Sequence, residues 1–257
     1  MPNLLVERHD GVVTLTLNRP DKMNAITREM WGGLRDVFDE VATRTDDRVL
    51  VITGAGRGFC GGADLVDAGM PQTAGYRLEH MRGVGRSAAA LRAIPKPTIA
   101  KVNGAAAGAG LNLALGCDLV IASDAARFSE IFVKRGLSID YGGSWLLPRL
   151  VGLHKAKELA FLAEVISAAE AERVGIVNRV VPADELDAAV DEIVGRLLQM
   201  APVALSQTKR LLDEAFSHSF AEAVEAEATA QVVNLGTSDV TEAVRAFMEK
   251  RDPKFTG

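Results

Sequence analysis

Two glycine-rich segments, residues 58–65 and 103–112, each follow a run of residues typical of a β-strand. They read GFCGGADL and NGAAAGAGLN. Because few bulky side chains project from such a segment, a ligand can approach the main-chain N–H groups closely. Two such segments therefore predict a site built from backbone hydrogen-bond donors, which is the arrangement that stabilises an oxyanion.

Short apolar runs alternate with helical patterns through the first two hundred residues. Strand-like runs at 49–53, 98–102 and 119–123 are separated by segments with helical spacing. This order favours parallel strands and an α/β fold. Two further strand-like runs, 4–8 and 12–17, are joined at Asp10-Gly11, which predicts a hairpin.

Beyond residue 184 the pattern is helical throughout. We expect helices at 184–200, 202–217, 220–235 and 239–250. We place a boundary near Ala201, which divides the chain into an α/β core at 1–200 and a helical C-terminal region at 201–257. The apolar stripes of that region need a surface to cover, either on the core or on a neighbouring subunit.

Composition excludes several classes of function. A formal net charge of −5 argues against nucleic acid as a partner. Cys60 and Cys117 lack the spacing of a zinc site or a disulfide framework, so no metal is expected. Residues 1–10 lack the apolar core of a signal peptide, and no apolar run is long enough for a membrane span. We therefore expect a cytoplasmic protein that does not enter membranes.

Two familiar enzyme motifs are not matched. The GAGRG run at 54–58 follows a strand, but its third glycine comes one residue early and no acidic residue follows at the expected distance. The chain also lacks the GxSxG turn that presents a nucleophilic serine in hydrolases. His80 lies in a mixed polar stretch and could line a pocket, although a solvated histidine is the more common case.

Two acidic residues are candidates for proton transfer. Asp140 follows apolar Leu137 and Ile139 and precedes a glycine pair that can start a helix. A carboxylate in apolar surroundings has a raised pKa and becomes a competent general base. Local chemistry leaves this role open against that of a turn or N-cap residue. Glu130, beside strand-like Phe128, is interpreted as structural.

Taken together, these segments resemble the crotonase superfamily, the enoyl-CoA hydratases and isomerases. The order and spacing of motifs along essentially the whole chain carry the resemblance: residues 18–25, 58–65, 95–97, 103–118, 142–149 and 250–255. The resemblance implies a spiral of ββα units with a helical C-terminal trimerisation region. It further implies a coenzyme A thioester as substrate, an enolate intermediate, no separate cofactor, and a homotrimer or a hexamer built as a dimer of trimers.

The family motifs also assign roles to residues. They make the backbone N–H groups of Ala63 and Ala109 the oxyanion donors. The expected substrate contacts are Asn24, Ala25, Gly62, Asp64, Leu65, Gly108, Asn112 and Tyr141. Lys250 or Lys254 is expected near the coenzyme A phosphates, and residues 66–86 are expected to line the acyl pocket.

The chain departs from the hydratases where they carry two catalytic glutamates. Asn112 and Phe132 occupy those positions, and neither an amide nor a phenyl ring can perform acid/base catalysis. Asp140 instead matches the single carboxylate of the double-bond isomerases and of the ring-opening epoxyphenylacetyl-CoA isomerase. We therefore expect an enoyl-CoA isomerase with Asp140 as base. The alternatives are an enoyl-CoA hydratase, the ring-opening isomerase, and a catalytically silent acyl-CoA-binding protein.

Overall fold

A computed structural model describes residues 2–66 and 73–257. The chain forms two compact units, the first comprising Met1–Ile94 and Thr98–Asp191 and the second Pro95–Pro97 and Glu192–Gly257. The change from one unit to the other falls within helix α7, Leu186–Leu198. A domain boundary near Ala201 stays a prediction.

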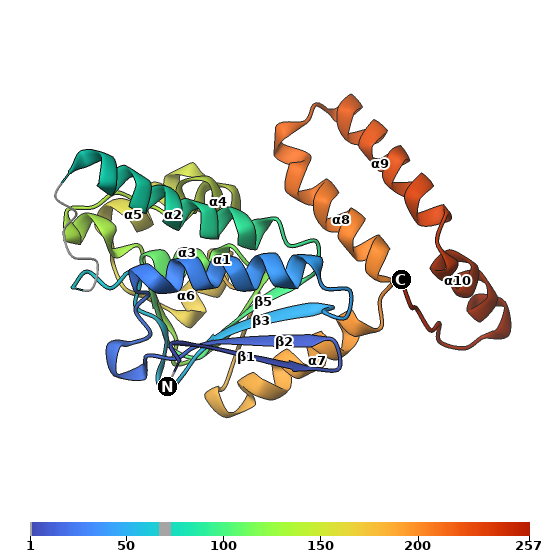
Figure 1. The fold of residues 1–257 in the computed structure, drawn as a ribbon, viewed down its shortest axis with the longest axis horizontal. Helices are drawn as coiled ribbons and strands as arrows, with labels where there is room; N and C mark the ends of the chain where they lie inside the picture. Colours follow the sequence, from blue (N-terminus) through green and yellow to red (C-terminus); the bar gives the residue numbers. More distant parts are fainter. Residues whose placement is uncertain (1, 67–72) are drawn as a thin grey trace. The chain divides into compact units, whose positions relative to one another are not determined.

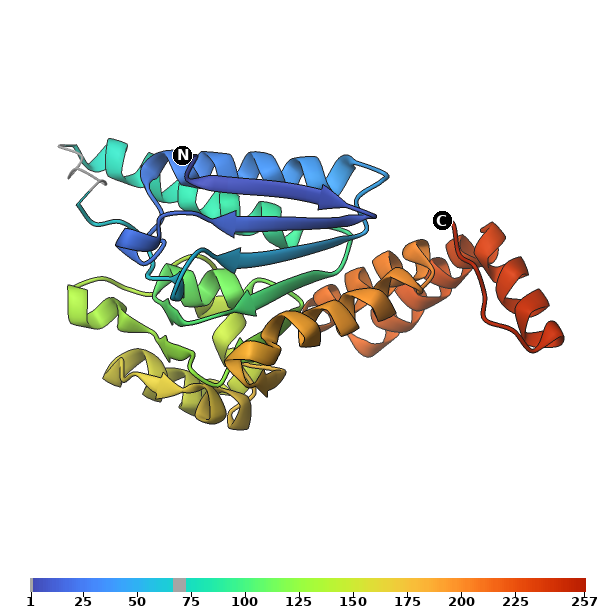
Figure 2. The same ribbon diagram turned by 90° about the horizontal axis from the view of Figure 1, so that it is seen from below.

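The first unit is built on a six-stranded sheet in the order β1-β2-β3-β5-β7-β10 (Figures 1 and 2). Its strands are β1 Leu4–His9, β2 Val12–Leu17, β3 Val49–Gly54, β5 Thr98–Val102, β7 Leu119–Ser123 and β10 Arg179–Val181. β1 is antiparallel to β2, and all the other neighbours are parallel. The predicted hairpin at Asp10-Gly11 and the predicted α/β class are both confirmed.

A smaller sheet brings the two glycine-rich segments together. It contains β4 Gly58–Cys60, β6 Ala105–Ala107, β8 Arg127–Ser129 and β9 Ile166–Ser167. β4 and β6 each lie inside one glycine-rich segment and pair in parallel, with Gly58 opposite Ala105. β8 then pairs with β6, so the chain just before Glu130 lies beside the second segment.

Helices cover the sheets of the first unit. They are α1 Arg28–Thr43, α2 Ala74–Arg92, α3 Ala109–Leu115, α4 Gly143–Val151, α5 Leu153–Leu162 and α6 Ala168–Arg173. α1 and α2 pack side by side, as both views show (Figures 1 and 2). The side chain of Thr27 caps α1 by accepting a hydrogen bond from Met30 N at 3.2 Å. The buried residues of α1, which recur at helical spacing, are Met30, Trp31, Leu34, Phe38 and Val41.

The mixed stretch around His80 is helical from Ala74 onward. The Thr73 side chain accepts a hydrogen bond from Tyr76 N and begins α2. Only Val84, Ser87 and Leu91 of this helix are buried, which explains the absence of a clean apolar period in the sequence.

The second unit is helical, as predicted. After the end of α7 it contains α8 Pro202–Glu214, α9 Phe220–Leu235 and α10 Ser238–Glu249. Buried Asp239 on α10 accepts a hydrogen bond from Thr256 N at 2.9 Å, and Glu242 pairs with Arg251 at 2.6 Å. These contacts hold the C-terminal segment against α10. No helix in the described residues is long and apolar enough to cross a membrane.

Candidate active site

The two glycine-rich segments pack so tightly that side chains would not fit between them. Gly62 has a φ of +99°, and a Cβ added there would lie 2.9 Å from Ala107 O and 3.6 Å from Ala109 N. A Cβ added to Gly110 would overlap the carbonyl oxygen of Cys60. Glycine at these positions therefore allows the main chains of the two segments to meet.

Each segment presents one main-chain N–H group at this junction. Ile26 pairs with Gly62 O and Asp64 N, at 2.8 and 2.9 Å, so the N–H of Ala63 points away from Ile26. Ala109 is the first residue of α3, where an N–H has no carbonyl partner within the helix. In the described part of the chain, neither N–H donates to a protein acceptor. Gly108 N, by contrast, donates to Ser129 O at 2.9 Å.

A hollow of about 390 Å³ opens beside the first segment. It is lined by Arg19, Lys22, Ala25, Ala63, Asp64, Leu65 and Val66. The expected contacts Ala25, Asp64 and Leu65 are thus brought to one place with Ala63. Arg19 braces the wall, since its Nη1 lies 2.9 Å from Asp64 Oδ2 and donates to Ala25 O at 2.6 Å.

The sequence reasoning missed the two basic residues of this hollow. Arg19 and Lys22 fall within the NRPDK motif, and their charge was the signal that could have identified them. Asn24, which was expected among the substrate contacts, has a fully buried side chain. Its Nδ2 donates to Ala55 O at 2.9 Å and to Gly58 O at 2.7 Å, so this amide holds loops together.

Asp140 lies in the turn between a short 3-10 helix, Ile131–Arg135, and α4. Its backbone carbonyl accepts hydrogen bonds from Asn112 Nδ2 and Gly143 N, both at 2.9 Å. Burial raises the pKa of its carboxyl group to about 6. Gly142 caps α4 without a side-chain hydrogen bond, so Asp140 is not the N-cap of this helix.

Asn112 and Phe132, the residues at the positions of the two hydratase glutamates, are both buried. Asn112 is fully buried on α3. A Cβ added to Gly108 would lie 3.6 Å from Phe132 Cζ, so the phenyl ring stands beside the residue that precedes Ala109. Neither side chain supplies a carboxylate next to the second glycine-rich segment.

Glu130 is the unexpected member of this site. It is only 2% exposed, and the described residues provide no hydrogen-bond partner for either carboxyl oxygen. Burial, and then the nearby charge of Asp140, raise its pKa to about 8, while interaction with the Asn112 side-chain amide lowers it. A structural carboxyl group normally accepts hydrogen bonds, whereas the Asn112 amide donates to the Asp140 carbonyl and no group of the described chain has hydrogen-bonding geometry toward the Glu130 oxygens.

Tyr141 links the site to α1 and α2. Its ring centroid lies 5.2 Å from that of Trp31, and its hydroxyl is 3.2 Å from Ser87 Oγ. Burial raises the pKa of the phenol, so the side chain stays neutral. Its contact with substrate stays a prediction.

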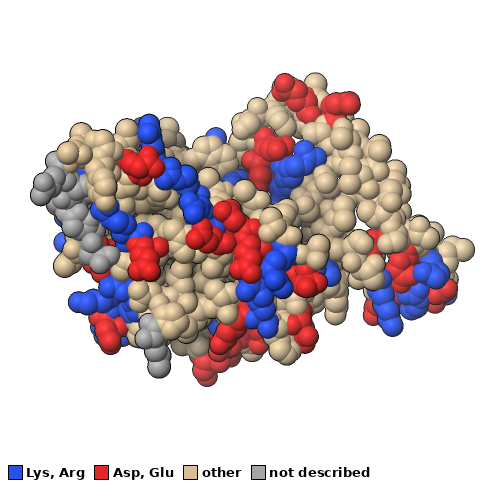
Figure 3. All heavy atoms as spheres, viewed as in Figure 1, with Lys and Arg blue, Asp and Glu red and all other residues tan. Residues whose placement is uncertain are grey.

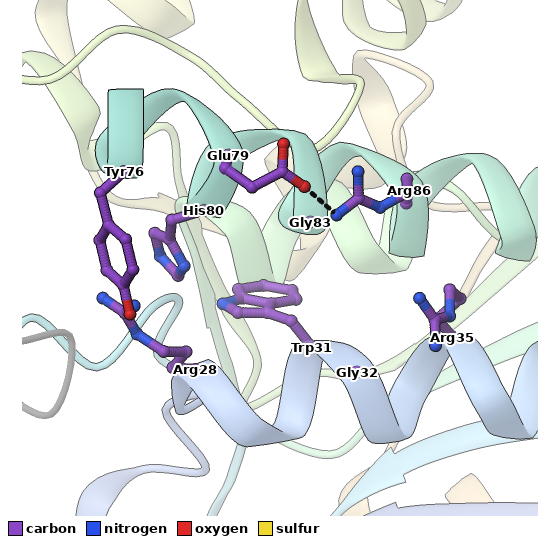
Figure 4. Close-up of a pocket in the computed structure, with 9 residues that line it drawn as sticks. All are labelled: Arg28, Trp31, Gly32, Arg35, Tyr76, Glu79, His80, Gly83 and Arg86. Atoms are coloured by element: carbon purple, nitrogen blue, oxygen red, sulfur yellow. Dashed lines mark hydrogen bonds and ion pairs between the residues drawn. The ribbon is translucent and has the colours of Figure 1, made fainter. Parts of the chain in front are cut away.

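A second hollow, of about 280 Å³, lies between α1 and α2 (Figure 4). Trp31 and Arg28 line it from α1, and Tyr76 and His80 line it from α2. His80 therefore does line a pocket, and burial lowers its pKa. The part of residues 66–86 carried by α2 contributes to this hollow, whereas residues 67–72 lie outside the described residues.

Main-chain N–H groups without a protein acceptor in the described chain, together with a carboxyl group of raised pKa, are the kinds of group that enzymes use to stabilise an oxyanion. The described residues contain no cluster of His, Cys, Asp and Glu suited to a metal ion.

Known proteins identify the family. The model of the enoyl-CoA hydratase/isomerase family matches residues 7–257. The chain is 37% identical to the 1,2-epoxyphenylacetyl-CoA isomerase of Escherichia coli K12, with 100% of this chain and 99% of the relative covered. It is 36% identical to the crotonyl-CoA hydratase of Syntrophomonas wolfei, with 98% and 97% covered.

The fold agrees with this assignment. The crystal structure of an enoyl-CoA hydratase from Bacillus anthracis superposes with a TM-score of 0.95 at 30% identity and covers both chains fully. The chain belongs to the enoyl-CoA hydratase/isomerase family and has the crotonase fold, as the resemblance implied.

Proposed function

We propose that the protein is an enoyl-CoA isomerase with Asp140 as its single base. Asp140 removes a proton from carbon 2 of a 3-enoyl-CoA, and the electron pair of the broken C–H bond moves toward the thioester oxygen. The Ala63 and Ala109 N–H groups hold the resulting enolate oxygen. Asp140 then returns the proton to carbon 4, which yields the 2-enoyl-CoA.

The observation that carries this proposal is the partial burial of the Asp140 carboxyl group and the raised pKa that results. A pKa of about 6 leaves the carboxyl group mostly ionised at neutral pH and still basic enough to take a proton. Loss of one oxyanion donor in other enzymes costs about 3 kcal/mol of transition-state stabilisation, so the two N–H groups matter as much as the base.

The side chains around the second segment favour isomerisation over hydration. Adding water needs a second group to activate it, and Asn112 and Phe132 stand where the hydratases have glutamates. The relatives include an isomerase and a hydratase at nearly equal identity, so overall similarity favours neither reaction. The choice of isomerisation is supported by the pattern of carboxylates at positions 112, 132 and 140. Enoyl-CoA hydration and ring-opening isomerisation are the alternative reactions.

The hollow beside Ala63 supports binding of the coenzyme A moiety. Lys22 supplies positive charge there, which suits phosphate groups, whereas the charge of Arg19 is paired with Asp64. We further propose assembly into a trimer or a dimer of trimers, because α9 exposes large apolar side chains such as Phe220, 87% exposed, and Val232, 70% exposed. The surface over α9 is largely uncharged (Figure 3). We place the protein in the cytoplasm.

Parallel assays of two substrates test the proposed reaction. A 3-enoyl-CoA should gain the absorbance of a conjugated thioester, whereas crotonyl-CoA should lose its absorbance slowly. Rapid loss from crotonyl-CoA would assign hydration instead. Thermal stabilisation by acyl-CoA without turnover of either ester would indicate a silent binding protein.

A further inference from the structure

Four buried side-chain oxygen atoms lack a hydrogen-bond partner in the described chain and belong to three interacting residues. They are Asn112 Oδ1, both carboxyl oxygens of Glu130, and Asp140 Oδ1, and no group in the described residues hydrogen bonds to them. Asn112 Nδ2 is fixed on the Asp140 carbonyl at 2.9 Å. The Asp140 charge and the Asn112 amide both influence the pKa of Glu130. Main-chain contacts place the same residues together, because Ser129 O accepts a hydrogen bond from Gly108 N at 2.9 Å and Gly108 O accepts one from Asn112 N at 3.0 Å. Glu130, Asn112 and Asp140 therefore share one polar region.

Two other buried carboxylates of this chain, by contrast, have ionic or hydrogen-bonding partners. Asp47, also 2% exposed, lies 3.4 Å from Arg8 and 3.7 Å from Arg44. Asp239, 3% exposed, accepts hydrogen bonds from main-chain N–H groups. An unpaired buried carboxylate is costly, so Glu130 is stable at its position only as the neutral acid or in a functional role.

We propose that Glu130 is the uncharged acid partner of Asp140, and that the site works only while one carboxyl group of this pair is ionised and the other is neutral. The proposal rests on the proposed function, in which Asp140 is the base. Glu130 transfers no proton in this scheme and acts on the reaction only through its own charge state.

Electrostatics explains why the charge state matters. Two carboxylates in one buried region do not both ionise readily. A neutral Glu130 leaves the single negative charge on Asp140, from which it moves to the thioester oxygen as the enolate forms. An ionised Glu130 would add a second negative charge beside the second glycine-rich segment, where Gly108 N donates to Ser129 O at 2.9 Å, and this charge would oppose the build-up of negative charge on the thioester oxygen. The pKa values of about 6 and about 8 place the active window between them.

Asp140 is the only charged group of the described residues that shifts the pKa of Glu130. The charged side chains on the neighbouring elements are exposed or engaged elsewhere. Lys134 and Arg135 follow Glu130 along the chain and are exposed. Lys155 on α5 is paired with Glu158 at 2.7 Å. α3 carries no charged residue, and Arg149 of α4 lies over the Trp145 ring. Asp140 is the charged group that acts on Glu130.

The pH profile of kcat/KM for isomerisation tests the proposal. The wild-type profile should rise through about pH 6 and fall through about pH 8. The substitution Glu130→Gln keeps the shape of the side chain but cannot ionise, so the alkaline fall should disappear. The ratio of kcat/KM at pH 9 to that at pH 7 should then rise about tenfold over wild type. Glu164→Gln, at an exposed glutamate, is the matched control and should keep both limbs.

Infrared spectroscopy gives a second measurement that does not require turnover. At pH 7 the wild type should show the carbonyl band of a protonated carboxyl group, and Glu130→Gln should lack it. A wild type without this band would overturn the proposal even if the variant did not fold. A wild type that isomerises 3-enoyl-CoA without an alkaline fall would also overturn it. A wild type that shows the band but does not isomerise would contradict the proposed function alone.

Discussion

The side-chain amide of Asn112 donates a hydrogen bond to the backbone carbonyl of Asp140 at 2.9 Å. This contact ties α3, which begins at Ala109, to the turn that carries Asp140, the proposed base. If Asp140 is the base, as we propose, Asn112 positions it through its backbone.

Asn112→Ala should lower kcat for isomerisation about tenfold with a smaller change in KM. The reason is that loss of a buried hydrogen bond costs on the order of 1 kcal/mol and frees the turn at Asp140. Steady-state kinetics and thermal unfolding measure the two effects. A variant that unfolds at lower temperature but keeps its kcat would show that the hydrogen bond serves stability alone.

Gly62→Ala should strongly impair isomerisation and lower the free energy of unfolding by more than about 1 kcal/mol. Its φ is +99°, and the added Cβ would press on Ala107 O and displace the second segment. Gly195→Ala is the matched control, because nothing lies within 4 Å of a Cβ at this position of α7. The control should raise the unfolding free energy by roughly 0.5–1 kcal/mol. An unchanged rate in Gly62→Ala would contradict the account of the donors.

Introducing carboxylates at the two hydratase positions should shift the reaction. The double variant Asn112→Glu, Phe132→Glu should increase hydration of crotonyl-CoA relative to isomerisation of a 3-enoyl-CoA, since two carboxylates can then activate water. Asn112→Glu combined with Val133→Glu is the comparison, because Val133 is exposed. An equal increase in both variants would show that position 132 does not face the substrate.

The raised pKa of Glu130 makes stability depend on pH. Between about pH 4.5 and pH 8 the folded state holds a proton on Glu130 that the unfolded state has released. The free energy of unfolding contributed by this group therefore falls as pH rises through that window. Glu130→Gln should lose this fall and be more stable than wild type at pH 9, by up to a few kcal/mol. Parallel denaturant titrations at pH 5 and pH 9 would reveal the opposite sign if Glu130 were an ionised structural residue.

Local signals in the sequence were enough for much of the architecture. The Asp10-Gly11 turn and the helical C-terminal pattern each follow from residues near in sequence, and the structure confirms them. The first part of α2, around His80, has no clear helical period because few residues of this helix are buried.

Sequence motifs predicted only part of the candidate site. The glycine-rich segments and Asp140 could be found by motif. Glu130 was also found as an acidic candidate but was interpreted as structural, because the long-range packing that buries it without a hydrogen-bonding partner in the described chain leaves no local signal.

The substitution Asp140→Asn tests the central claim most directly. The amide keeps the volume of the side chain but cannot take a proton, so conversion of 3-enoyl-CoA should fall by roughly 10²- to 10⁴-fold while binding of the acyl-CoA persists. Asp184→Asn, at an exposed aspartate, is the control and should keep wild-type turnover. Near-native turnover by Asp140→Asn would contradict the assignment of Asp140 as the base.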